Sequence, residues 1–104
     1  MGTILATSRT PDVIQEIGRR LRRVRLQRNE SIEGLAHEAG VGVNTLRRLE
    51  AGQSVGTIYF VRVLRALGRL SALDAFLPEP EVSPIQVSKL KGERRQRASR
   101  SSDA

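Results

Sequence analysis

Residues 31–52 constrain the fold most, because they predict two short helices joined by a tight turn. Ser31 suits the start of the first helix, since its hydroxyl can accept a hydrogen bond from a free backbone N–H. Gly40 suits its end, since glycine takes the left-handed conformation that reverses the chain. Val41 can then fill the corner between the helices. The second helix is expected over residues 42–50.

Apolar residues recur in this segment at steps of three and four, which places them on the inward face of each helix. The inward set is Ile32, Leu35, Ala36, Ala39, Leu46 and Leu49. The outer side of the second helix carries Val43, Asn44, Arg47 and Arg48. This arrangement is typical of a helix-turn-helix that places its second helix in the major groove of DNA.

The four outer residues have side chains that suit base edges. Val43 can offer a methyl contact to thymine, and Asn44 can make two hydrogen bonds with adenine. Arg47 or Arg48 can fork onto guanine, with Thr45 at the edge of the groove. Adjacent arginines are also common on a helix face that simply meets solvent. Their place on the second helix of the turn favours base reading.

The composition points to a polyanionic partner. The 104 residues allow one domain with a modest core, and 18 Lys and Arg against 11 Asp and Glu give a formal charge of +7. Nucleic acid is the first candidate partner and an acidic protein the second. The absence of cysteine excludes disulfides, and a single histidine argues against a structural zinc site, so no cofactor is expected.

No run approaches the roughly 20 apolar residues that span a bilayer, and residues 1–10 lack the features of a secretion signal. We therefore expect a cytoplasmic protein without a membrane partner.

The helical pattern extends on both sides of the turn, and no convincing alternating strand pattern occurs. The expected fold is all-α, with five helices near residues 11–28, 31–40, 42–50, 57–67 and 70–77. Thr10 is the expected capping hydroxyl of the first helix, and Phe60, Val61, Leu64 and Leu67 are the expected buried stripe of the fourth. The organisation is then a flexible arm (1–9), a helix-turn-helix domain (10–77), and a Pro/Glu linker with a basic tail (78–104).

The first helix is rich in arginine, with six arginines between positions 19 and 28. Most must project into solvent, and we expect one or two to reach DNA phosphates, with Arg19 and Arg23 as the candidates. Ser54, after the second helix of the turn, is a further phosphate candidate. Gly18 lowers helix propensity, which suggests a close contact with a neighbouring helix.

The basic tail, residues 89–102, leaves several roles open. It is either a solvated terminus, an arm that follows the DNA backbone, or a segment that orders against a partner.

An enzyme is the weakest hypothesis, because catalysis needs polar groups that converge in a pocket. His37 is the only histidine, and adjacent helix positions do not face each other, so His37 and Glu38 do not form a dyad. Gly40 and Gly42 serve the turn rather than a phosphate-binding loop.

Three pieces of sequence stand out together: I-G-R-R-L-R-R-V-R at 17–25, L-A-H-E-A-G-V at 35–41 with L-R-R-L-E-A-G at 46–52, and L-R-A-L-G at 64–68. They resemble the Xre/phage-repressor family of helix-turn-helix proteins. The resemblance implies a five-helix domain that acts as a homodimer on a palindromic operator, with a semi-buried pair between Arg25 and Glu50. Two positions depart from the family pattern, since Ile32 stands where many members have a phosphate-binding glutamine and Gly42 where many have a polar cap.

The region 70–97 also looks like the regulators encoded beside HipA-type toxin kinases. This second resemblance implies a HipB-like antitoxin that represses its own operon and holds a kinase toxin inactive. The leading hypothesis is therefore a sequence-specific transcriptional repressor. The alternative is a protein-interaction module that neutralises a partner protein and has incidental affinity for DNA.

Overall fold

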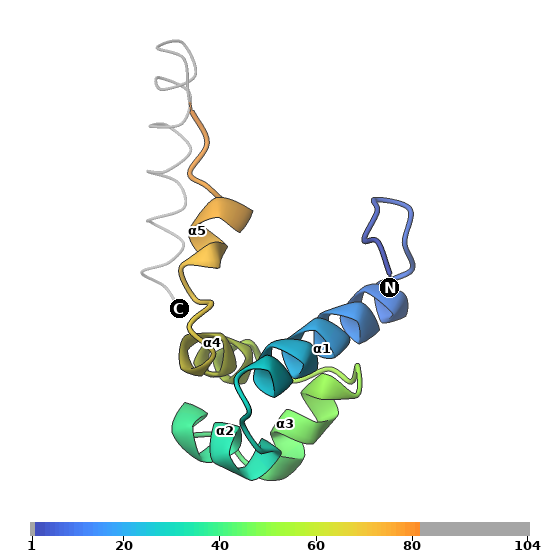
Figure 1. Cartoon of the computed structure of the whole chain (residues 1–104). Helices are drawn as coiled ribbons and strands as arrows, with labels where there is room; N and C mark the ends of the chain where they lie inside the picture. Colours follow the sequence, from blue (N-terminus) through green and yellow to red (C-terminus); the bar gives the residue numbers. More distant parts are fainter. Residues whose placement is uncertain (1, 82–104) are drawn as a thin grey trace, which may run out of the picture.

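A computed structural model describes residues 2–81 and shows an all-α fold, as the sequence predicted (Figure 1). Its helices are α1 (Thr10–Gln27), α2 (Ile32–Ala39), α3 (Val43–Glu50), α4 (Thr57–Ala66) and α5 (Ala72–Phe76). Within residues 2–81, no helix is both long and apolar enough to cross a membrane. The basic tail predicted over residues 89–102 lies outside the described residues.

The turn between α2 and α3 has the predicted chemistry. The Ser31 hydroxyl accepts a hydrogen bond from the Gly34 N–H at 3.0 Å and caps α2. Gly40 ends α2 in the left-handed region with φ of 70°. Because of this reversal, the Val41 N–H donates back to the Ala36 carbonyl at 3.0 Å. The turn is therefore held by the chain's own backbone.

The prediction that Thr10 caps α1 is wrong. The capping position is occupied by Arg9, whose carbonyl accepts the Val13 N–H at 3.0 Å, and no side chain caps this end. Thr10 is already helical, with Pro11 after it. The helix can start this early because N–H groups of the first turn have no intrahelical acceptor, so proline loses nothing there.

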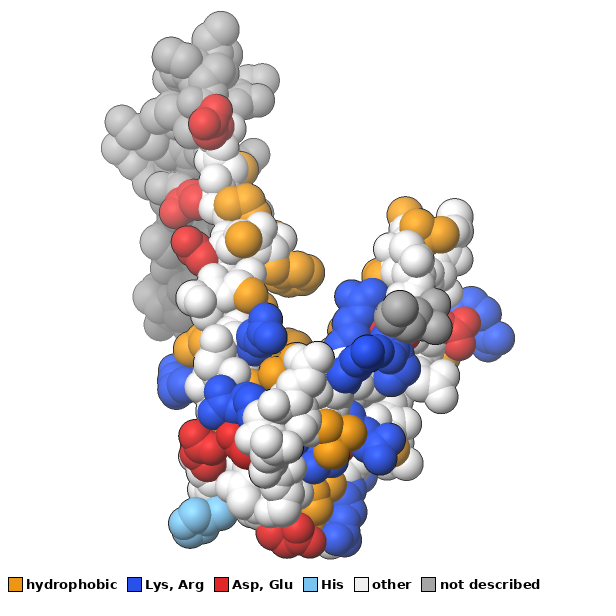
Figure 2. Space-filling model, viewed as in Figure 1, with side chains coloured by type: hydrophobic (Ala, Val, Ile, Leu, Met, Phe, Trp, Pro, Cys, Tyr) orange, Lys and Arg blue, Asp and Glu red, His pale blue; other side chains and the backbone are white. Residues whose placement is uncertain are grey.

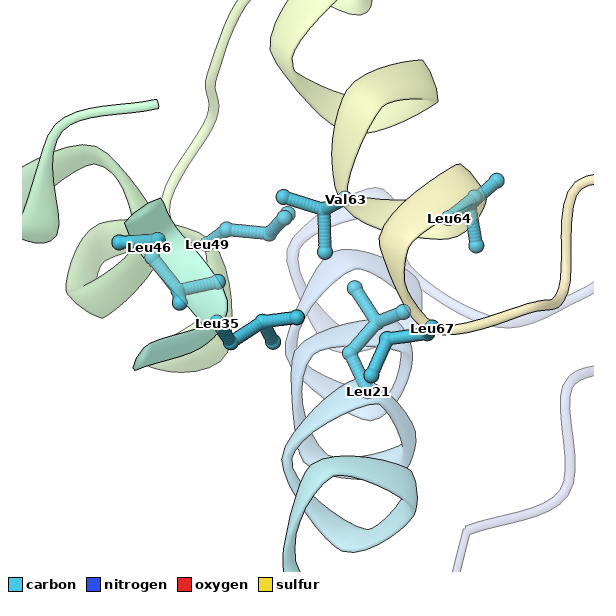
Figure 3. Packing of buried hydrophobic residues seen from close by; sticks show 8 residues of the cluster. Leu21, Leu35, Leu46, Leu49, Val63, Leu64 and Leu67 are labelled. Atoms are coloured by element: carbon cyan, nitrogen blue, oxygen red, sulfur yellow. The ribbon is translucent and has the colours of Figure 1, made fainter. Parts of the chain in front are cut away.

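The core lies where α1, α2, α3 and α4 meet (Figure 3). Its buried members are Leu21, Leu35, Ala36, Leu46, Leu49, Val63, Leu64 and Leu67. Val63, which the predicted stripe of α4 omitted, is fully buried, whereas Val61 is only partly buried. The inward face of α4 therefore runs through Phe60, Val63, Leu64 and Leu67, a stricter three-and-four spacing than the predicted one.

Helix α5 stands apart from the other four helices (Figure 1). Leu70 and Leu73 pack against the core and attach it. Phe76 and Leu77, at the end of the predicted fifth helix, are each 77% exposed. They follow the attached turn, and Pro78 comes directly after them, so the helix is too short to bring them back to the core.

Helix α1 crosses the end of α3 at very close range. Gly18 is buried there, and a Cβ atom at this position would collide with the Leu49 carbonyl oxygen and lie 2.8 Å from the Glu50 carbonyl oxygen. Gly52, with φ of 84°, approaches the same helix, since its Cβ would lie 2.7 Å from the Gln15 Cα. The close helix contact predicted for Gly18 is confirmed.

Gly18→Ala should therefore destabilise the fold although alanine favours helix. We expect a loss of about 1–3 kcal/mol in the free energy of unfolding, because backbone atoms of α3 must move away. Urea denaturation measures it. Gly34→Ala in α2 is the matched control, since its Cβ would meet only the Ser31 hydroxyl at 3.0 Å. A Gly18→Ala protein as stable as wild type would contradict the tight contact.

Candidate nucleic-acid interface

An ion pair between Arg25 and Glu50 braces α1 against the end of α3. The Arg25 Nε donates to Glu50 Oε2 at 2.8 Å and its second terminal nitrogen to Oε1 at 3.0 Å. The first terminal nitrogen donates to the Glu30 carbonyl at 2.9 Å. The two side chains are only 9% and 7% exposed. The hydrogen bonds to the Glu50 carboxylate raise the pKa of Arg25 above its usual value, so the guanidinium stays charged.

With α3 fixed in this way, its outer side faces solvent. Asn44, Arg47 and Arg48 are exposed there, and the Asn44 side chain makes no hydrogen bond to another described residue. Val43 and Thr45 are partly buried, and Val43 packs against the core. Of the five residues predicted to lie in or beside the groove, three are thus exposed and two are partly buried.

Arg47 and Arg48 lean to opposite sides of α3. Arg47 lies 3.6 Å from the Glu33 carboxylate at the start of α2, and both side chains are mostly exposed. Arg48 donates to the Ser54 carbonyl in the loop after α3 at 3.3 Å. Exposed contacts of this length contribute little to stability, so DNA could displace either one. Ser54 itself is exposed beside Arg48.

Arg19, a predicted phosphate ligand, belongs to a cluster centred on the Glu16 carboxylate. Arg19 donates to Glu16 through two nitrogens, the shorter bond being 2.7 Å, and the Arg20 Nε donates at 2.9 Å. The Gly2 N–H adds a bond of 3.1 Å, which ties the N-terminal arm to α1. The hydrogen bonds from Arg19, helped by those from Arg20 and Gly2, lower the pKa of Glu16 to about 2.

Two open depressions flank the junction of α1 with the end of α3. One, of about 550 Å³, lies under the N-terminal arm and includes Arg19 and Arg22. The other, of about 460 Å³, includes Arg22, Arg25 and Arg47. Arg22 thus lines both, whereas Arg23, one of the predicted phosphate ligands, is exposed and lines neither.

Sequence reasoning did not select Arg22, although a usable signal was present. Arg22 precedes Arg25 by three positions, so the two share a face of α1. Placing Arg25 against Glu50 would therefore have placed Arg22 beside α3 as well. Figure 2 shows basic side chains along α1 and on the α3 side of the molecule, with others near α4.

Comparison with protein families matches residues 16–76 to the model described as Helix-turn-helix domain. The chain belongs to this helix-turn-helix family. The match covers more than half of the chain and spans all of α2, α3 and α4. No curated protein matches the chain. The family makes DNA the partner of this helix-turn-helix protein.

Removing one partner of the brace should destabilise this helix-turn-helix protein strongly. Arg25→Ala leaves the Glu50 carboxylate buried without its cation. We expect this to lower the free energy of unfolding, measured by urea denaturation, by about 3 kcal/mol. The double variant Arg25→Met with Glu50→Leu should lose less than Arg25→Ala alone, because no charge is then left uncompensated. Arg65→Ala, an exposed arginine of α4, is the control. A loss for Arg25→Ala no larger than the control's would contradict the brace.

The Glu16 cluster should respond to pH only in acid. The pKa of Glu16 is about 2 in the folded protein, below the ordinary value of 4.5. The ionised carboxylate therefore contributes its full stabilisation of the fold above pH 4.5. The contribution is lost as the pH falls toward 2. An NMR titration of the Glu16 carboxyl carbon should show a midpoint near 2, and Arg19→Gln should raise it. A wild-type midpoint near 4.5 would mean that the cluster does not form in solution.

Proposed function

We propose that the protein is a sequence-specific transcriptional repressor that places α3 in the major groove of its operator. The observation that supports this most is the exposed side of α3, where Asn44, Arg47 and Arg48 project from a helix braced at its far end by Arg25 and Glu50. A braced helix loses little conformational freedom on binding, which favours specific contacts.

The dimensions of α3 suit this role. A helix with its side chains is about 10–12 Å across, and the major groove is about 12 Å wide. In the proposal, Val43 contacts a thymine methyl group and Asn44 bonds an adenine. Arg47 and Arg48 are the candidates for guanine, with Thr45 at the groove edge.

Phosphate contacts complete the proposed interface on both sides of α3. Ser54 and the loop around it supply one side. Arg19 and Arg23 of α1 are the candidates on the other, although Arg19 would first have to exchange Glu16 for a phosphate.

The resemblance to Xre-type repressors extends the proposal to a homodimer on a palindromic operator upstream of its own gene. We also propose that the protein is cytoplasmic, because its operator lies there. The proposed repressor has no catalytic activity. The HipB-like resemblance adds a HipA-like kinase toxin as a possible second partner. The homodimer, the palindromic operator and the toxin partner are proposed from these sequence resemblances.

A protein-interaction module is the second candidate function, and one observation favours it. Phe76 and Leu77 leave two large apolar side chains in solvent at the end of α5, where a second copy or another protein could cover them. In this candidate the charge of the chain attracts DNA only incidentally.

Fluorescence anisotropy against duplex DNA from immediately upstream of the gene, with a scrambled duplex as reference, separates the two functions. At about 150 mM salt the proposed repressor should bind the upstream duplex more tightly than the scrambled one. Equal, salt-sensitive binding to both duplexes would favour the protein-interaction module.

Arg48→Ala tests base reading by α3. We expect it to cost about 1–3 kcal/mol on the upstream duplex and little on the scrambled one. Arg65→Ala removes the same charge from α4 and should leave the preference unchanged. Equal losses on both duplexes would make Arg48 a phosphate ligand.

A further inference from the structure

An open depression between α1, α2 and α3 gathers cations from two helices. Its volume is about 460 Å³. The lining residues are Arg22, Arg25, Ile32, Arg47, Glu50 and Ala51. We call it the arginine depression. It opens on the same side of the molecule as the outer face of α3, because Arg47 belongs to both.

Of its three arginines, two have donors to spare. The Arg25 guanidinium already donates hydrogen bonds to the Glu50 carboxylate and to the Glu30 carbonyl. Arg22 is exposed and makes no ion pair with any residue in the range 2–81. Arg47 has only its long contact of 3.6 Å with Glu33. The depression therefore offers two guanidinium groups, from α1 and α3, to one anion.

The position of the depression relative to α3 identifies the anion. A helix lying in the major groove nearly fills its width, so elements beside that helix lie over the groove walls, where the phosphates are. Arg48 and Ser54 occupy one side of α3, and Arg22 and Arg47 occupy the other. We propose that the arginine depression binds a backbone phosphate of DNA, held between Arg22 and Arg47. This inference rests on the proposed function and names the phosphate contact on the α1 side.

Two features of α2 support and limit this site. The helix starts at Ile32, whose amide belongs to the unpaired first turn and favours an anion in the depression. Glu33, 65% exposed, is the opposing charge. In the free protein it holds Arg47 loosely, and the phosphate must take Arg47 from it. Glu33 therefore weakens attraction to any DNA until a phosphate is correctly placed.

The inference gives Arg47 a role other than base reading. Arg22 and Arg47 should contribute to binding of every sequence, whereas Arg48 and Asn44 remain the residues that distinguish sequences. The two adjacent arginines of α3 would then serve different parts of the DNA.

The test measures the salt dependence of binding by the full chain, with the upstream and the scrambled duplex as probes between about 50 and 300 mM salt. Arg22→Ala and Arg47→Ala should each reduce the slope of log affinity against log salt by about 0.9, the value for one lost phosphate. At 150 mM salt that corresponds to about fivefold weaker binding to both duplexes. Glu33→Gln should instead strengthen binding to both.

Arg69→Ala is the matched control, since it removes an exposed arginine from the connection between α4 and α5. Its slope should stay at the wild-type value. The inference is overturned if Arg22→Ala behaves like this control, or if Arg47→Ala weakens only the upstream duplex, as a base contact would. Thermal melting of each variant excludes loss of folding as the cause.

The outcomes also separate this inference from the proposed function. A wild-type protein that prefers the upstream duplex, with an unchanged slope in Arg22→Ala, would retain the repressor and reject the phosphate site. If the wild-type protein binds both duplexes equally but Arg22→Ala reduces the salt slope, the phosphate site is retained and the repressor is rejected.

Discussion

The ion pair between Arg25 and Glu50 sets the position of α3, the helix proposed to meet DNA. Burying two charges is costly, so the pair favours one geometry, in which both oxygens of Glu50 meet the guanidinium. Glu50 is the last residue of α3, and Arg25 lies in the last turn of α1. Fixing these two helix ends fixes the direction of α3. Asn44, at the other end of α3, is left to project freely.

Close backbone contact makes the same junction rigid. Gly18 lets α1 approach the Leu49 and Glu50 carbonyl groups, and Gly52 lets the chain leave α3 beside Gln15. Leu46 and Leu49 hold the inward side of α3 in the core. Polar, backbone and apolar contacts therefore act on one short helix, and an eight-residue helix that would be marginal alone becomes a stable support.

The turn between α2 and α3 could be predicted from the sequence because it depends on local contacts. Contacts between residues far apart in the sequence could not be predicted as well. Ser31 and Gly40 act on backbone atoms a few positions away, so their roles follow from the sequence directly. The burial of Val63 depends on how α4 crosses its neighbours, and the exposure of Phe76 depends on α5 leaving the bundle. Arg22 was missed because charge alone does not show which face of α1 meets α3. The roles of Asn44 and Arg48 on DNA stay predictions.

The arginines of α1 differ in function although they form one basic run. Arg19 and Arg20 bind Glu16, Arg25 is buried against Glu50, and Arg28 bonds Glu30 at 2.7 Å and the Leu67 carbonyl at 3.1 Å. The acidic partners neutralise charge that would otherwise attract DNA of any sequence. Arg22 has no such partner among the described residues, and it lies beside α3, the helix proposed to enter the groove. A basic helix can thus serve specific binding, because Arg22 keeps its charge available at the site proposed for the phosphate.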